Sequence, residues 1–106
     1  MNDTWKKSVM QATVSVGRFC VYCGKRASHA DHIIPSVLGG KDCAENLVPA
    51  CASCNCKKGP RRLKPEIEKE LLLKAFIDAP LVNEVARVLY HKQSKSNRSI
   101  VPLEFV

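Results

Sequence analysis

Two Cys-x-x-Cys pairs constrain the fold of this chain more than any other feature of its sequence. The four cysteines are Cys20, Cys23, Cys51 and Cys54. Each pair presents two sulfur atoms from one tight turn, and zinc in structural sites takes four ligands in a tetrahedron. Two redox-active pairs or four unconnected thiols are the alternatives, but redox Cys-x-x-Cys motifs usually occur once, in a βα context. The matched pairs therefore predict one structural Zn²⁺ site.

The length of the chain makes such a metal valuable to the fold. With 106 residues it is expected to be a single domain, 1–106, at the lower end of the size that buries a self-sufficient core. A structural zinc contributes on the order of 10 kcal/mol of folding free energy in small domains. Cys43 and Cys56 remain outside the two pairs and are most simply free thiols, although Cys56 lies close enough in sequence to be a spare ligand.

The charge balance indicates a polyanionic partner. The chain has 17 Lys and Arg against 10 Asp and Glu, a net charge of +7, so nucleic acid is the leading candidate and an anionic membrane the lesser one. No apolar run approaches the roughly 20 residues that cross a bilayer. Residues 1–16 lack the features of a signal peptide. We expect a soluble, cytoplasmic protein with no membrane partner, in a reducing compartment that favours metal ligands or free thiols over disulfides.

Between and after the cysteine pairs, the pattern predicts a hairpin followed by a helix. Gly39 and Gly40 and the absence of apolar periodicity mark a loop. Gly24 closes the first Cys-x-x-Cys turn, because glycine tolerates the positive φ that such a turn requires. The helix is expected to end at Gly59, before Pro60. The predicted elements are strands at 29–35 and 46–48, a loop at 36–45, and a helix from about residue 50 to residue 59.

Helices are predicted on both sides of this core. Apolar residues at helical spacing indicate an N-terminal helix within 5–16, although Val14 and Val16 would also suit a strand. A helical extension at 63–93 begins at Pro65, where proline is tolerated, and we expect a break at residues 78–80 to divide it into two helices. The apolar stripes of these helices are most simply core packing. Residues 94–106 form a tail whose last seven residues could pair as a strand or dock.

A second group of residues offers oxygen rather than sulfur. Cys51, Cys54, Asn55 and Lys58 share one face of the predicted helix, at i, i+3, i+4 and i+7. Asn55 would therefore point back toward the hairpin, which carries Asp31. Both side chains offer the oxygen donors that Mg²⁺, Mn²⁺ and Ca²⁺ prefer, and two protein ligands leave positions for water and a phosphate oxygen. His32, next to Asp31, is suited to act as a general base.

These residues resemble the motif of the HNH endonucleases, the zinc-containing branch of the ββα-metal nucleases. The resemblance covers residues 20–59 and includes the segments Asp31-His32-Ile33-Ile34-Pro35, Gly39-Gly40, Asn46-Leu47, Cys51-Ala52-Ser53-Cys54-Asn55 and Lys58-Gly59. We therefore expect a small α+β fold with a ββα-metal hairpin–helix core and a four-Cys structural zinc, flanked by an N-terminal helix and two C-terminal helices. The last motif position is Asn55 instead of histidine, which still supplies an oxygen ligand.

The resemblance also implies a role for each residue. Asp31 and Asn55 would bind a catalytic divalent metal, Mg²⁺ or Mn²⁺, and His32 would deprotonate the attacking water. Asn46 would tie down the hairpin loop through backbone hydrogen bonds and so aim His32. The implied reaction is hydrolysis of a DNA phosphodiester that leaves a 5′-phosphate and a 3′-hydroxyl. His29 shares a strand face with Asp31 and could touch the substrate phosphate or a metal-bound water, or it is simply a surface residue.

Basic residues around the end of the predicted helix are candidates for DNA contacts, with a solvated surface as the alternative. They are Lys57, Lys58, Arg61, Arg62 and Lys64. No module that reads base sequence is evident, so we expect low specificity or a protein partner that supplies it. The rival function is a zinc-stabilised nucleic-acid-binding or assembly module without nuclease activity. The sequence favours the enzyme, because such a module has no need for Asp31, His32 and Asn55 together.

Overall fold

A two-stranded antiparallel hairpin forms the centre of the fold, as the sequence predicts. Its strands are β1 (His29–His32) and β2 (Leu47–Ala50), and the register pairs His29 with Ala50 and His32 with Leu47. Every residue of β2 is buried. The computed structural model describes residues 3–99, and the side chains of residues 3–92. The predicted strand or docking segment at 100–106 lies outside the described residues.

The loop between the strands contains two short 3₁₀ turns, η1 (Ser36–Leu38) and η2 (Ala44–Asn46). Gly39 follows η1 with a φ of 94°, a conformation that glycine adopts at little cost. Gly40 lies against the other side of the loop, since a Cβ at this position would be 1.7 Å from the carbonyl oxygen of Ile34. The two sides of the loop are therefore packed against each other at Gly40 and Ile34.

The helix after β2 is short and begins at a cysteine of the predicted zinc site. α2 spans Ala52–Lys58, seven residues, and the Sγ atom of Cys51 caps it by accepting a 3.4 Å hydrogen bond from the Cys54 amide. It ends at Gly59, whose φ is 52°. Isolated helices shorter than about 12 residues are marginal in water, so α2 depends on its neighbours.

The predicted N-terminal helix is confirmed as α1 (Asp3–Gly17). Its buried face includes Val9 and Ala12, which belong to the main apolar cluster. The end of α1 lies close to β2, because a Cβ at Gly17 would be 2.3 Å from the Cγ atom of Pro49. Glycine at this position therefore permits a contact between helix and strand that a larger residue would prevent.

The prediction of two C-terminal helices is wrong, because α3 runs without a break from Pro65 to Ser99 and includes Pro80. It also covers residues 94–99, which the sequence assigned to the tail. Pro80 is exposed, so water can satisfy the Phe76 carbonyl that loses its helical partner. On the opposite face Ala75, Ala79 and Val82 are buried. Packing on that face keeps the helix continuous.

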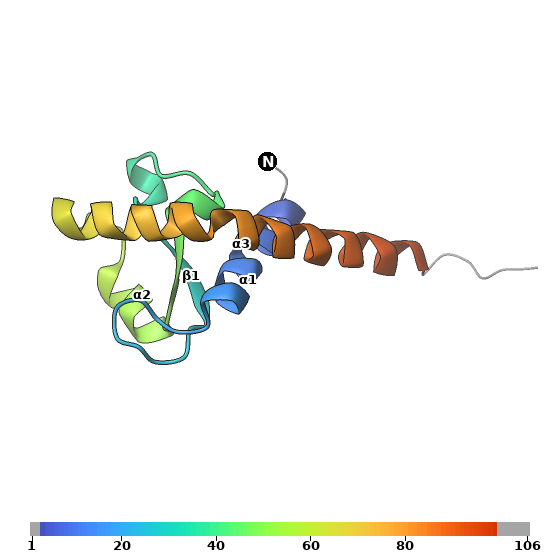
Figure 1. Ribbon diagram of the computed structural model, residues 1–106, viewed down its shortest axis with the longest axis horizontal. Coiled ribbons are helices and arrows are strands. Elements are labelled where there is room, and N and C mark those ends of the chain that lie inside the picture. The colour runs from blue at the N-terminus through green and yellow to red at the C-terminus, as the bar shows by residue number, and fades with distance from the viewer. Residues whose placement is uncertain (1–2, 100–106) are drawn as a thin grey trace, which may run out of the picture.

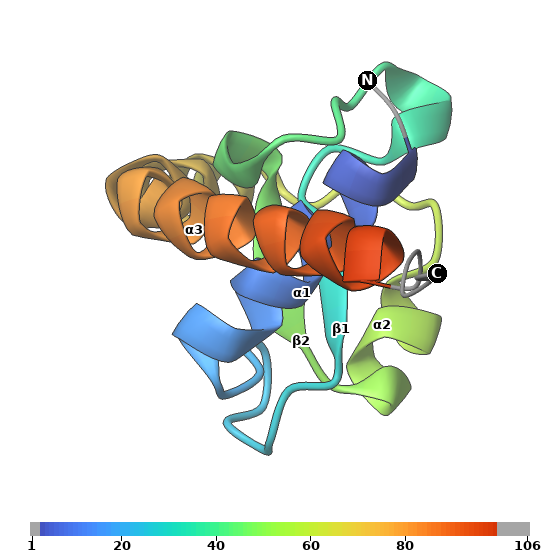
Figure 2. The same ribbon diagram turned by 90° about the vertical axis from the view of Figure 1, so that its right-hand side faces the viewer.

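The elements surround the hairpin on different sides. β1 lies between α1 and α2, and α3 lies across α1 (Figure 1). Figure 2 shows the same order from the side, with β1 and β2 next to each other behind α3. Within residues 3–99, no helix has both the length and the apolar character needed to span a membrane. The fold is thus a small α+β arrangement in which the hairpin faces α1 on one side and α2 on the other.

Candidate active site

The four cysteines of the two pairs lie together. The Sγ atoms of Cys20, Cys23, Cys51 and Cys54 all lie within 4.8 Å of one another. Those of Cys23 and Cys51 are 3.6 Å apart, and four sulfurs bound to one zinc ion at about 2.3 Å would be separated by about 3.8 Å. The cluster could therefore hold a structural zinc ion. Cys43 and Cys56 are free thiols outside it.

Backbone amides prepare two of these sulfurs for metal binding. The amides of Tyr22 and Cys54 donate hydrogen bonds of 3.4 Å to the Sγ atoms of Cys20 and Cys51. Burial alone would raise the pKa of Cys20, but backbone hydrogen bonds outweigh it and lower that pKa to about 6. The hydrogen bond from the Cys54 amide also lowers the pKa of Cys51. The thiolate is the form that binds metal, so these hydrogen bonds favour the ligand state of Cys20 and Cys51, whereas the hydrogen bond with Cys51 raises the pKa of Cys54 to about 12.

The first Cys-x-x-Cys turn also reaches Asp31. The hydroxyl of Tyr22 donates a 2.7 Å hydrogen bond to Oδ2 of Asp31. Burial and this hydrogen bond raise the pKa of Tyr22 above its usual range, so the hydroxyl remains protonated and acts as the donor. The Asp31 side chain is buried in the middle of β1. Tyr22 therefore fixes one carboxylate oxygen and leaves the other, Oδ1, toward α2.

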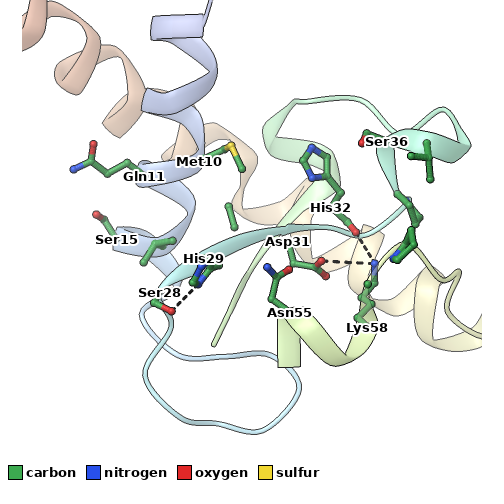
Figure 3. A pocket seen from close by; sticks show the side chains of 16 residues that line it. Met10, Gln11, Ser15, Ser28, His29, Asp31, His32, Ser36, Asn55 and Lys58 are labelled. Carbon is green, nitrogen blue, oxygen red and sulfur yellow. Dashed lines mark hydrogen bonds and ion pairs between the residues drawn. The ribbon is translucent and has the colours of Figure 1, made fainter. Parts of the chain in front are cut away.

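Asn55 and Lys58 approach the same carboxylate from α2, one turn apart. Lys58 Nζ lies 3.7 Å from Oδ1 of Asp31 and donates a 2.8 Å hydrogen bond to the backbone carbonyl of His32. The Asn55 side chain lies beside Asp31 (Figure 3), and no hydrogen bond within the described residues engages its amide group. The Asp31 carboxylate and the Asn55 amide thus line the same cavity as the buried Lys58 ammonium group.

A residue of the loop between β1 and β2 holds the His32 side chain. Its Nε2 atom lies 2.6 Å from Oδ1 of Asp42, and the other oxygen of Asp42 lies 3.6 Å from Lys6 Nζ on α1. The hydrogen bond to His32 lowers the pKa of Asp42, so Asp42 is ionised at neutral pH. The His32 side chain is 20% exposed, which leaves the ring accessible from the adjacent cleft.

Asn46 connects the two sides of the loop that separates His32 from Asp42. Its Oδ1 accepts a 2.9 Å hydrogen bond from the Ile34 amide, and its Nδ2 donates to the carbonyl oxygens of Ile34 and Lys41, both at 3.0 Å. Ile34 comes two residues after His32, and Lys41 comes directly before Asp42. The buried amide therefore holds the backbone on both sides of the His32–Asp42 pair.

These residues line one side of a cleft between α1 and α2 with a volume of about 830 Å³. Asp31, His32, Asn55 and Lys58 form this side, and Gln11 and Ser15 of α1 belong to the other (Figure 3). His29 also lines the cleft, where Ser28 Oγ lies 2.8 Å from its Nδ1. The structure thus brings Asp31, His32, Asn55 and His29 to one cavity, whereas Asn46 is not among the residues that line it.

The basic residues after Asn55 do not form one uniform surface. Lys57 and Lys64 are exposed, whereas Lys58 is 8% exposed and points into the cleft. Arg61 donates to the carbonyl oxygens of Lys57 and Lys58. Arg62 donates two hydrogen bonds, of 2.8 and 3.1 Å, to the carboxylate of Glu68. Lys57, Arg61 and Arg62 line a second groove, which Lys58 also borders, with a volume of about 350 Å³.

Sequence reasoning missed two residues of the site, Tyr22 and Asp42. Tyr22 occupies one of the variable positions of a Cys-x-x-Cys turn, and Asp42 belongs to a loop without periodicity. No spacing rule links either residue to its partner. The inward position of Lys58 had a signal, since it shares a helix face with Cys51 and Asn55.

Comparison with known proteins points to one family. Residues 20–61 match the family model described as HNH endonuclease, and this match confirms the resemblance predicted from the motif. Neither the curated proteins nor the solved structures contain a significant match. The matched segment begins at the first cysteine of the thiol cluster and ends just beyond α2, so it includes both strands of the hairpin.

Proposed function

We propose that this chain is a metal-dependent DNA endonuclease and that the cleft between α1 and α2 is its active site. One observation carries the proposal. The fold brings the side chains of Asp31, His32 and Asn55 to one accessible cavity, beside a cluster of four thiols that could hold zinc. The match to the HNH endonuclease family over residues 20–61 supports the same reaction class.

The donors in the cleft suit a hard divalent cation. Asp31 Oδ1 and the amide oxygen of Asn55 are both oxygen donors. Among the described residues Oδ1 forms an ion pair with Lys58 at 3.7 Å, and no hydrogen bond engages the Asn55 side-chain amide. Two such ligands form an open site with room for water and a phosphate oxygen. We assign Asp31 and Asn55 to Mg²⁺ or Mn²⁺. Bound there, the ion would neutralise charge on the scissile phosphate and on the leaving 3′-oxygen.

The remaining catalytic and positioning roles belong to side chains of the protein itself. His32 accepts a proton from the attacking water. Lys58 holds Asp31 in place and contributes positive charge to the cleft, which favours a bound phosphate. Asn46 fixes the loop, so that the His32 ring stays at the edge of the cavity. The products are a 5′-phosphate and a 3′-hydroxyl.

Exposed basic residues next to α2 would contact flanking phosphates. Lys57, Lys64 and Arg61 are available for such contacts, which are electrostatic and largely independent of base sequence. The zinc site would hold α2 against the hairpin and so keep Asn55 next to Asp31. Because residues 3–99 contain no evident element that reads bases, the enzyme would cut with low specificity or take its specificity from a protein partner.

A plasmid-nicking assay with the zinc-loaded protein and Mg²⁺ or Mn²⁺ tests the proposal. We expect the wild-type chain to convert supercoiled plasmid into nicked or linear forms. His32→Ala should lower the rate by roughly 100-fold or more, because general-base catalysis contributes about that much. DNA affinity and zinc content should remain unchanged. His91→Ala, at an exposed histidine of α3, serves as the matched control and should cut normally.

Two outcomes would contradict the proposal. Undiminished cutting by His32→Ala would remove His32 from the reaction. Tight DNA binding without cleavage in either metal would instead support the nucleic-acid-binding module as the function of the chain.

A further inference from the structure

We propose that Asp42 is a positioning residue for His32, one that accepts the Nε2 proton of the ring and so leaves Nδ1 as the atom that takes a proton from water. The proposal rests on the function proposed for the cleft. It assigns a role to a residue of the loop that neither the motif nor the spacing of the sequence singled out.

The contact between the two side chains supports this assignment. Nε2 of His32 lies 2.6 Å from Oδ1 of Asp42, a short distance that is typical of a hydrogen bond to a charged group. The lowered pKa of Asp42 means that its carboxylate is ionised at neutral pH, and an ionised carboxylate can only accept. Nε2 must therefore carry the hydrogen. In a neutral imidazole ring the second nitrogen is then the acceptor.

The remaining ring nitrogen, Nδ1, is available to accept a proton. No hydrogen bond in the described part of the chain involves Nδ1 of His32, and the residue lines the cleft. The hydrogen bond to Asp42 also restricts rotation of the ring. Asp42 thereby selects both the tautomer and the orientation in which His32 meets a water molecule.

Asp42 is itself held from two sides. Lys6 on α1 lies 3.6 Å from its second oxygen. The backbone next to it is fixed by the hydrogen bond from Asn46 to the Lys41 carbonyl. Because Asn46 also binds both backbone groups of Ile34, one amide sets the distance between the strand end that carries His32 and the loop that carries Asp42.

A purely structural role for Asp42 makes different predictions. The side chain is 36% exposed, and exposed ion pairs contribute little to stability. Loss of the carboxylate should therefore change the free energy of unfolding little in either case. The tautomer of His32 and the cleavage rate separate the two roles.

Asp42→Asn is the most informative variant, because asparagine has nearly the same shape but its amide can donate to Nε2. If Asp42 acts only as a surface partner, the variant should keep both the ring state and the rate. If Asp42 selects the tautomer, the amide of Asp42→Asn, with its oxygen toward the Lys6 ammonium group, will donate to Nε2 and favour the opposite one. Asp78→Ala is the matched control, since Asp78 is a partly exposed aspartate paired with Lys74 on α3, at 2.9 Å.

NMR of isotope-labelled histidine rings in the zinc-loaded full-length chain reports the tautomer directly, at a pH where His32 is neutral. We expect the Nε2–H form in the wild type and in Asp78→Ala, and a shift toward the Nδ1–H form in Asp42→Asn. A wild-type ring with its hydrogen on Nδ1 would overturn the proposal. This measurement needs no nuclease activity, so it decides the tautomer even if the proposed function fails.

Single-turnover cleavage with Mg²⁺ completes the test. We expect Asp42→Asn to lower the rate by roughly 100- to 10,000-fold, since a wrong tautomer removes the general base, while its Kd for DNA stays at the wild-type value. Asp78→Ala should cut at the wild-type rate. If the wild type cuts and Asp42→Asn cuts equally fast, the positioning role is wrong, and the nuclease function stands.

Discussion

The Tyr22 hydroxyl lies 2.7 Å from Oδ2 of Asp31, so a residue of the cysteine-bearing turn holds the carboxylate at the centre of the cleft. Tyr22 stands between Cys20 and Cys23 in the chain. The turn thus carries two sulfurs of a cluster that could hold zinc and also orients a carboxylate. The thiol cluster and the oxygen-rich cleft are physically joined through this one side chain.

Tyr22→Phe is expected to weaken that connection without removing the aromatic ring. A buried carboxylate oxygen would lose its donor, which costs about 1–3 kcal/mol. We expect the free energy of unfolding in urea to fall by this amount, and the Mg²⁺ concentration for half-maximal cleavage to rise. Tyr90→Phe, on α3, should leave both quantities unchanged. Equal stability of Tyr22→Phe and the wild type would show that the hydrogen bond contributes nothing.

If the thiol cluster binds zinc, loss of one of its sulfurs should unfold the core, whereas loss of the neighbouring thiol outside the cluster should not. Cys54→Ser removes a sulfur of the cluster, and Cys56→Ser removes an exposed thiol two residues later on the same helix. We expect Cys54→Ser to retain less than about one zinc ion per chain and to lose helical circular dichroism, because zinc binding supplies folding free energy. Cys56→Ser should match the wild type in both. Normal zinc content in Cys54→Ser would contradict the assigned ligand set.

Gly40→Ala is expected to distort the loop that carries Asp42. A Cβ at this position would lie 1.7 Å from the Ile34 carbonyl oxygen and 2.9 Å from Nδ2 of Asn46, so the loop must move. Overpacking of this kind costs about 1–3 kcal/mol. We expect lower stability in thermal denaturation together with slower cleavage. Gly24→Ala, where no atom lies within 4 Å of the new Cβ, has strain from its φ of 80° alone and should cut nearly as fast as the wild type.

Glu68→Gln is expected to strengthen DNA binding. Glu68 accepts two hydrogen bonds from Arg62, which occupies a guanidinium group next to the second groove. Release of Arg62 would add about one phosphate contact. The slope of the logarithm of the binding constant against the logarithm of salt concentration would become steeper by about one unit. Glu66→Gln removes the same charge from the same turn of α3 without freeing an arginine. If the two variants bind DNA equally well in a salt titration, Arg62 makes no phosphate contact.

The hairpin, α2 and the four-thiol cluster could be predicted because they depend on short-range spacing. Two Cys-x-x-Cys turns, Gly59 after the helix and the polar residues between them have meaning within a few positions of the sequence. The partners of Asp31 and His32 could not be predicted. Tyr22 and Asp42 reach them across nine and ten positions of the chain, through turns whose path depends on the folded loop.

The prediction for α3 failed for a different reason, because tertiary packing outweighed a strong local signal. Proline costs about 3 kcal/mol inside a helix, and Pro80 predicted a break. Buried small residues on the other face of α3 and the packing of the helix on α1 and η2 outweigh that cost. Which side of a helix faces water decides whether proline ends it, and the local pattern around residue 80 did not reveal that side.

Cys51 both caps the start of α2 and belongs to the thiol cluster, and this double position has a consequence for when the protein becomes active in the cell. Asn55 and Lys58 reach Asp31 only from a formed helix, and a helix this short forms only when its capping residue is anchored. We therefore expect newly synthesised chains in a zinc-starved cell to remain unable to cut, however much Mg²⁺ surrounds them. The supply of one metal would then determine when the chemistry of the other can start.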